Sequence, residues 1–542
     1  MDFGMGKNNA FRLAGSALLA SFFALFFAYP LVLIFSKAFA SGFSGFFLLA
    51  DFLSSHSALL RNSFFQASIS TFFAVLIGVP AAYIVARRDF PGKKLLKAFS
   101  LVPAVFPSIL VVLAFIIVLG NNGWVNSFLS KYLGFNEPVQ FLYGFFGIIV
   151  AHVFYNFPLV LKFVSSAWEN LDVSMKEAAK TLGAGKLRVF LSVTLPQLLP
   201  SILASASLVF IYTFMSFAIV ISLGGIQFTT LEVEIYRQIS RGLNFELGAL
   251  LVLFQFVALS LVAFAYSKFS SRTVIQERLY TEKPQKLNPN SLRGIVELFF
   301  LFLVVLFVAV PIISIFVFSF FDASTGAFSL DGIKTIFFPA AKSLSGTTPI
   351  TAIFNSLAFA VIASVTATFL GLLASLKQTH IKGLNFFLGA SIAVSVITLA
   401  FGYLVAFGSG NFFIIALGHS VLAFPFALRI IGNALAKVDD ASVDAAKTLG
   451  ANDFDVLKLV QLPRIKGALL ASMAFGFAIS LGELGLVMVL YDGVFPTMPV
   501  YIFRLLGTYQ IFAATTMGLV LAFISFISFY AIETFLKDVR VF

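Results

Sequence analysis

The sequence predicts an all-α polytopic membrane protein with about twelve transmembrane helices in two parallel six-helix repeats. Of its 542 residues, 60% are hydrophobic and only 11% are charged, and the mean hydropathy is +1.00. A soluble domain of this length would need far more charge to cover its surface. Long apolar segments also recur from one end of the chain to the other, each near the roughly 20 residues that a helix needs to cross a bilayer.

Twelve segments have this length. They fall near 12–36, 61–86, 98–119, 144–167, 199–222, 247–267, 294–319, 351–376, 384–408, 411–432, 467–490 and 512–535. The first resembles a signal peptide, because Ala38-Phe39-Ala40 has the look of a cleavage site. Its apolar run of about 25 residues exceeds the roughly 7–15 of a signal peptide. We therefore expect an uncleaved first helix.

The positive charges follow the membrane topology. With the N-terminus inside, 26 of the 36 Lys and Arg fall in inside loops and tails, and 8 fall in outside loops. This asymmetry predicts that both termini are cytoplasmic. The basic cluster in 87–97 is then a topology signal, and the net charge of +12 does not indicate nucleic-acid binding.

The absence of cysteine excludes disulfides, thiol catalysis and cysteine-ligated metal. The 71 Phe indicate packing against lipid and between helices.

A polar phrase occurs twice, without insertion or deletion. "EAAKTLGAGKLRVFLSVTLP" begins at Glu177, and "DAAKTLGANDFDVLKLVQLP" begins at Asp444, 267 positions later. The same offset relates His152 to His419; before the fourth span it becomes 293, because the first half has 26 more residues in one outside loop. Each half crosses the membrane an even number of times, so the two units are parallel repeats.

The repeat sets the expected domain boundaries. The first repeat covers 1–266, with its core at 58–266, and the second covers 295–542, with its core at 350–535. Between them, 267–294 is polar, carries Pro284 and Pro289, and is typical of a cytoplasmic linker.

Each copy of the phrase predicts two short helices joined at a glycine. In the first copy, Ser174 and Glu177 have the spacing of a capping box. Gly183 supplies a left-handed turn, and Pro196 is expected to close the unit before the next span. The second copy has cap candidates Asp439 and Asp440, a turn at Gly450, and a second cap at Asn452 or Asp453. The alternative is an amphipathic loop lying on the bilayer, but the identical register of two copies argues against it.

The pattern E-A-A, three residues, G, nine residues, I-x-L-P resembles the cytoplasmic loop of ABC importer permeases with the type I, MetI-like fold. Val193 and Val460 stand in place of the isoleucine, and Asp444 replaces the glutamate. In that family the loop forms coupling helices that dock into a cleft on the ATPase subunit. The resemblance, which covers nearly the whole chain, therefore implies ATPase-coupling residues at Glu177, Ala178, Ala179, Gly183, Asp444, Ala445, Ala446 and Gly450.

This resemblance implies a transport subunit and not an enzyme. The expected partners are two copies of an ABC ATPase, a periplasmic or lipoprotein substrate-binding protein and the bilayer of the bacterial inner membrane; no cofactor, metal or nucleic acid is expected. A phosphate-binding loop is missing, since Gly185-Lys186 is followed by Leu187. Two other functional classes are alternatives. One is a secondary transporter driven by an ion gradient, in which paired coupling loops would have no role. The other is a membrane enzyme, but the sequence shows no catalytic constellation.

Fused twelve-helix permeases of this kind resemble those for thiamine and ferric iron, with related members for polyamines and phosphonates. "AHVFYNFPLVLKF" and "SLGELGLVMVLYDGVFPTMPVYIFRLLG" favour the thiamine type. Glu483 is the carboxylate well inside a predicted span, and Ser216 is its repeat mate. An intramembrane acid is costly and indicates function. The pair is therefore a candidate for the substrate pathway, although a structural hydrogen-bond role for Glu483 is the alternative. For His152 and His419, packing or hydrogen bonding is expected before metal ligation.

Overall fold

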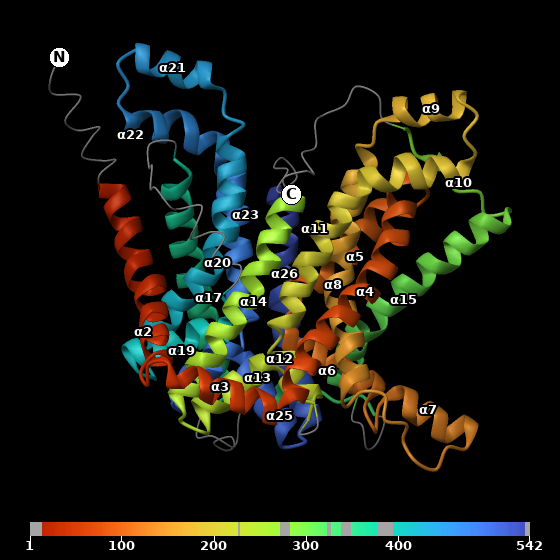
Figure 1. Ribbon diagram of the computed structural model, residues 1–542. Helices are drawn as coiled ribbons and strands as arrows, with labels where there is room; N and C mark the ends of the chain where they lie inside the picture. The colour runs from red at the N-terminus through yellow and green to blue at the C-terminus, as the bar shows by residue number, and fades with distance from the viewer. Residues whose placement is uncertain are drawn as a thin grey trace. The chain divides into compact units, whose positions relative to one another are not determined.

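A computed structural model describes residues 14–225, 228–270, 282–321, 327–337, 348–376 and 394–536. Within these residues the chain is almost wholly helical, and eleven helices are long and apolar enough to cross a membrane (Figure 1). Each of the eleven overlaps a predicted span, although Ser108–Leu133, Lys186–Phe214 and Asp453–Leu481 are displaced from the predicted bounds by eight or more residues. The remaining predicted span, 384–408, is described only from 394 onward and contains helix α19 (Val396–Phe407). The all-α polytopic class is confirmed.

The contacts divide the chain into two compact units. Unit 1 consists of Met1–Leu48, Ile235–Leu253 and Ser319–Phe542, and unit 2 consists of Leu49–Glu234 and Phe254–Phe318. Each unit therefore combines the body of one predicted repeat with the leading helix of the other. The chain passes between the units within α3 (Ser44–Ser55), α13 (Leu231–Ser240) and α14 (Phe245–Ser270), and near the end of α15 (Leu292–Phe320).

Unit 2 is built around α4, α8 and α11. Besides α15, its helices are α4 (Ser57–Arg87), α5 (Lys93–Val105), α6 (Ser108–Leu119), α7 (Trp124–Leu133), α8 (Phe145–Glu169), α9 (Val173–Thr181), α10 (Lys186–Val189), the π-helical segment η2 (Phe190–Thr194), α11 (Leu195–Phe214) and α12 (Ala218–Leu223). Two short strands, β1 (Arg88–Asp89) and β2 (Gln285–Lys286), pair in parallel. The longer loop of the first half, predicted to lie outside, contains α7.

Unit 1 is built around α17, α20 and α23. Besides α19, its elements are η1 (Ala24–Ala28), α2 (Tyr29–Ala38), α16 (Asp331–Phe337), α17 (Pro349–Ser375), α20 (Phe412–Leu435), α21 (Asp440–Thr448), α22 (Asp453–Val456), the π-helical segment η4 (Leu457–Gln461), α23 (Leu462–Leu481), α24 (Gly485–Leu490), α25 (Met498–Gly507) and α26 (Ile511–Leu536).

The same close helix crossing occurs in both units. A Cβ on Gly78 of α4 would lie 2.7 Å from the Cβ of Val160 on α8, and a Cβ on Gly371 of α17 would lie 2.9 Å from that of Ala427 on α20. These pairs are repeat mates by the offsets of 293 and 267. Small residues at such crossings let helices in a membrane approach closely. The crossing explains why glycine occupies both positions.

The leading helix of unit 1 is fixed by a tight contact with α19. The hydroxyl of Tyr403 donates to the backbone oxygen of Phe26 at 2.7 Å, and a Cβ on Gly402 would lie 2.7 Å from that of Pro30. In unit 2, α15 takes the corresponding role, with Phe307 packed against the rings of Phe115 and Phe154. Aromatic rings at these separations add to the packing energy.

Three predicted spans are interrupted. The 98–119 segment is two helices, α5 and α6, because Phe106, the residue before Pro107, takes extended backbone between them. The fifth span of each half is also broken: α11 ends at Phe214 before α12 begins at Ala218, and α23 ends at Leu481 before α24 begins at Gly485. The two breaks are 267 positions apart.

Candidate functional site

The repeated phrase forms a helical hairpin in each unit. In unit 2, α9 and α10 lie at the end of the bundle opposite α7, and in unit 1, α21 and α22 lie at the end opposite α25 (Figure 1). Gly183 has φ +79° and Gly450 has φ +91°. Both values lie in the left-handed region, which favours glycine. The predicted glycine turn is present in both copies.

The cap predicted for α9 is wrong. Its first turn is capped by Asp172, whose carboxylate accepts from both the backbone N–H and the hydroxyl of Ser174. Glu177 does not close a capping box and instead pairs with Lys180 at 2.8 Å. The short Asp side chain reaches the exposed amide two residues on, which leaves Ser174 inside the helix.

In the second copy Asp439 and Asn452 are the caps, whereas the other two candidates, Asp440 and Asp453, are the first residues of α21 and α22. Asp439 caps α21 by accepting from the amide of Ala441. Asn452 and Asp455 then form a reciprocal capping box at α22. Polar side chains thus satisfy the first amides of both short helices.

The proline after each hairpin does not close it, contrary to expectation. From Lys186 to Phe214 the chain is one continuous helix, as it is from Asp453 to Leu481. A proline removes one backbone donor and crowds the preceding turn. Both copies accommodate it with a π-helical turn immediately upstream, in which Leu195 N–H donates to Phe190 O and Leu462 N–H donates to Leu457 O. The second helix of each hairpin is thereby joined rigidly to a transmembrane helix.

Neither α9 nor α21 contains a buried residue. Glu177 and Ala178 are exposed and Ala179 is partly so, and Asp444, Ala445 and Ala446 repeat this pattern. The predicted coupling residues therefore share one accessible surface in each hairpin, within the part of the chain that the structure describes.

Sequence reasoning missed one pair of residues on these surfaces. Leu182 and Leu449, repeat mates that immediately precede the turn glycines, are each 88% exposed. The same apolar side chain is thus exposed at equivalent positions of both hairpins. The sequence does show that this leucine is repeated, since "TLG" occurs in both copies of the phrase.

Glu483 lies in the break between α23 and α24. Its Oε1 accepts from the amide of Gly485 at 2.8 Å, and its Oε2 accepts from the amide of Leu486 at 2.9 Å. The carboxylate thus satisfies the first amides of α24, where the helix dipole also favours negative charge. Ser216 occupies the equivalent break between α11 and α12, where its amide bonds to the backbone oxygen of Thr213.

The two histidines are buried and bonded to serines. His152 Nδ1 lies 3.3 Å from the hydroxyl of Ser70, and His419 Nδ1 lies 2.6 Å from that of Ser480. His419 Nε2 is also 3.8 Å from Glu483 Oε2. Among the described residues, no group of three or more His, Asp or Glu side chains is placed to hold a metal ion.

Comparison with known proteins adds the decisive observation. Residues 74–276 match the family described as binding-protein-dependent transport system inner membrane component. The thiamine transport system permease protein ThiP of Escherichia coli is 26% identical over 88% of this chain and 88% of its own length. Over most of its length the chain is similar to ABC importer permeases.

Other permeases match over a similar length. ThiP of Brucella abortus is 27% identical over 94% of this chain and 90% of its own length. The putative ferric transport system permease protein FbpB 1 of Haemophilus influenzae is 26% identical over 87% of this chain and 76% of its own. The prediction of a permease resembling the thiamine and ferric iron types is confirmed. Similarity to such permeases implies an ATPase and a binding protein as partners.

Proposed function

We propose that this permease forms the translocation pathway for thiamine, delivered by a periplasmic or lipoprotein binding protein and driven by two copies of a separate ABC ATPase. The observation that carries the substrate is similarity over most of both chains to permeases named for thiamine transport in several bacteria. Phe and Tyr faces along a membrane pathway also suit an aromatic cation, since cations are attracted to ring faces.

Uptake into proteoliposomes that contain the permease, its ATPase and its binding protein tests the substrate. We expect ATP-dependent accumulation of labelled thiamine. Ferric iron is the second candidate, because FbpB 1 matches nearly as much of the chain. Accumulation of iron without thiamine would replace the first proposal by the second.

For ATPase coupling, we assign one docking surface to each hairpin: Glu177, Ala178, Ala179 and Gly183 in the first, and Asp444, Ala445, Ala446 and Gly450 in the second. Their support is the paired geometry, because two exposed hairpins of equal shape fit the two clefts of an ATPase dimer. Leu182 and Leu449 extend the two surfaces.

Proline at the turns tests this assignment. Gly183→Pro and Gly450→Pro force φ near −65° where the turns need positive values. We expect both variants to insert into the membrane but to lose copurification with the ATPase and ATP-driven transport. Normal copurification and normal transport in both variants would remove the docking role.

The proposed orientation places both termini and the linker in the cytoplasm, on the side of the two hairpins. It rests on the distribution of Lys and Arg between the loops. A topology reporter fused after Gly294, or one fused after Arg540, should report a cytoplasmic location. An external location for either would require a different number of spans before that point.

A further inference from the structure

The end of the inter-repeat linker is bound to unit 2 by its backbone. We call Glu282–Ser291 the strap. Its strand β2 pairs with β1 at the cytoplasmic end of α4, with Arg88 opposite Gln285 and Asp89 opposite Lys286. Leu287 N–H extends the pairing to the backbone oxygen of Asp89 at 3.0 Å. A linker that only tethered two repeats would need no such pairing.

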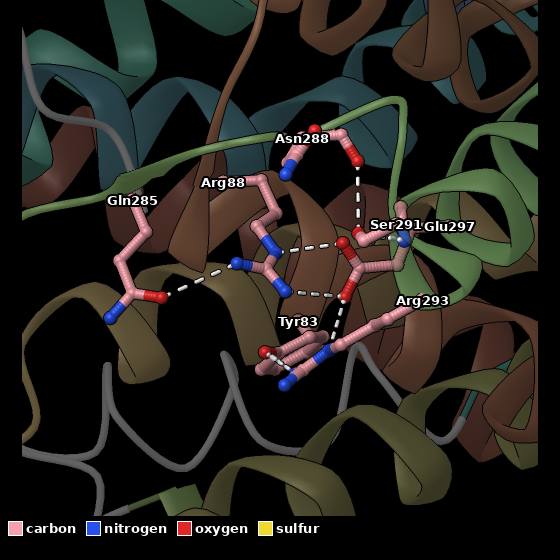
Figure 2. Close-up of polar contacts among 8 residues, drawn as sticks. Tyr83, Arg88, Gln285, Asn288, Ser291, Arg293 and Glu297 are labelled. Carbon is pink, nitrogen blue, oxygen red and sulfur yellow. Dashed lines mark hydrogen bonds and ion pairs between the residues drawn. The ribbon is translucent and has the colours of Figure 1, made fainter.

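A buried ion pair beside the strap joins β1 to α15, and its arginine also bonds to the strap (Figure 2). Arg88 donates to both carboxylate oxygens of Glu297, at 2.7 and 2.8 Å, and to the side-chain oxygen of Gln285 at 3.3 Å. Arg88 is 9% exposed and Glu297 is 7% exposed. Arg293 donates to the same carboxylate at 2.9 Å and also bonds to the hydroxyl of Tyr83. Bidentate arginine–carboxylate pairs fix geometry as well as charge.

The first residue of the strap contacts the first hairpin. Glu282 Oε2 accepts from Lys176 Nζ of α9 at 2.6 Å and lies 3.3 Å from Arg87 Nη1 of α4. Burial by itself would raise the pKa of Glu282, but the hydrogen bond from Lys176 and the charge of Arg87 outweigh it and hold the pKa below its ordinary value. Glu282 therefore joins α9 to α4 as a carboxylate.

The second hairpin is held differently. Its equivalent of Lys176 is Val443, which cannot form an ion pair. Instead, Arg464 of α23 donates to the hydroxyl of Ser442 on α21 at 3.0 Å. The repeat mates of these two residues are Gln197 and Met175, which make only an amide-to-thioether contact at 3.7 Å. A neutral bond to sulfur is weaker than a charged one to oxygen.

We propose that the strap positions the first coupling helix, with Glu282 doing for α9 what Arg464 does for α21. The inference rests on the proposed role of α9 in ATPase docking. Glu282 is a positioning residue, since it acts through Lys176. The two hairpins present the same docking surface but are held in place by different side chains.

Hydrogen–deuterium exchange on the purified full-length permease tests the positioning without any partner. In Glu282→Gln we expect the amides of 173–181 to exchange about fivefold faster, as suits the loss of a partly buried ion pair. The amides of 440–448 should not change. Arg464→Met should give the reverse pattern, with faster exchange in α21 alone.

Asp89→Asn is the matched control. It removes a carboxylate from β1 that lies outside the Arg88–Glu297 and Lys176–Glu282 pairs, so neither hairpin should change. Unchanged exchange of α9 in Glu282→Gln, or an equal effect of Asp89→Asn, would overturn the proposal.

A second measurement separates positioning from docking. In proteoliposomes with the ATPase and the binding protein, Glu282→Gln should lower the substrate transported per ATP about fivefold, while the ATPase still copurifies. If the hairpins do not dock the ATPase, Gly183→Pro and Gly450→Pro will show normal copurification and normal transport. If the strap does not position α9, Glu282→Gln will show wild-type exchange and wild-type coupling.

Discussion

Asn62 and Asn355 make the same hydrogen bond in the two halves of the chain. The side-chain amide of Asn62 donates to the backbone oxygen of Thr229 at 3.3 Å, and that of Asn355 donates to the backbone oxygen of Pro496 at 3.0 Å. The neighbouring serines repeat a second bond, each accepting from a buried amide at 2.8 Å. The serine–amide pairs are Ser63 with Leu231 and Ser356 with Met498. Two side chains on one helix thus hold the backbone that leads into α13 or α25.

The serine bonds predict matched losses of stability. Ser63→Ala and Ser356→Ala each leave a buried N–H without its acceptor, which costs about 1–3 kcal/mol. Unfolding in detergent should show similar losses for both. Ser54→Ala, at an exposed serine bonded within its own helix, is the control and should change stability little. Losses that are absent from both test variants would contradict a structural role for the pair.

The buried Arg88–Glu297 pair predicts that a single substitution costs more stability than the double substitution. Arg88→Met should destabilise unit 2 by about 3 kcal/mol, because it removes the bidentate partner of the buried Glu297. Arg88→Met combined with Glu297→Met should recover most of this loss, since Arg293 is largely exposed and can be solvated. Thermal melts of wild type, Arg88→Met, Glu297→Met and the double variant measure the difference. Additive losses would show that the two side chains are not coupled.

The two hydrogen bonds accepted by Glu483 predict that Glu483→Gln loses less stability than Glu483→Leu. Glu483→Gln keeps one acceptor and presents an amide donor to the other N–H, at a cost of about 1–3 kcal/mol. Glu483→Leu removes both acceptors and should cost roughly twice as much. Ser216→Ala at the equivalent break should be close to neutral. Wild-type stability in Glu483→Gln together with lost uptake would instead indicate substrate contact.

The lowered pKa of Glu282 predicts how its stabilisation depends on pH. Because the folded carboxyl binds a proton less readily than the unfolded one, its contribution is complete above the unfolded pKa. The contribution is lost as the pH falls through the folded pKa. The difference in melting temperature between wild type and Glu282→Gln should therefore be constant from pH 8 to pH 6 and shrink in acid. A difference that grows in acid would reverse the assigned sign.

Much of the fold could be predicted because its signals are local. Hydropathy locates the spans, and a glycine followed by a new helix start marks each hairpin turn, as at Gly183 and Gly450. The cap at α9 was misread because Asp172 and Ser174 are both suitable N-cap residues, and only the backbone conformation decides between them.

The missed features depend on partners that lie far apart in the chain. Lys176 and Glu282 are 106 positions apart, and nothing in the sequence around either residue identifies the other as its partner. The break at Ser216 lies in a continuous apolar run without proline, so tertiary packing decides it. Its repeat mate Glu483 is compatible with a break, because its carboxylate can cap the helix that follows, but the sequence alone does not require one.

If ATPase subunits cover both hairpins of one chain, they should protect cysteines placed on those hairpins from chemical labelling. The chain contains no cysteine, so Leu182→Cys and Leu449→Cys each introduce a single thiol at a position that is 88% exposed. Tyr509→Cys, at an exposed turn between α25 and α26, is the control. We expect the ATPase to slow maleimide labelling at Leu182→Cys and Leu449→Cys severalfold but to leave Tyr509→Cys unchanged. Equal labelling with and without the ATPase at both leucine positions would contradict this coverage.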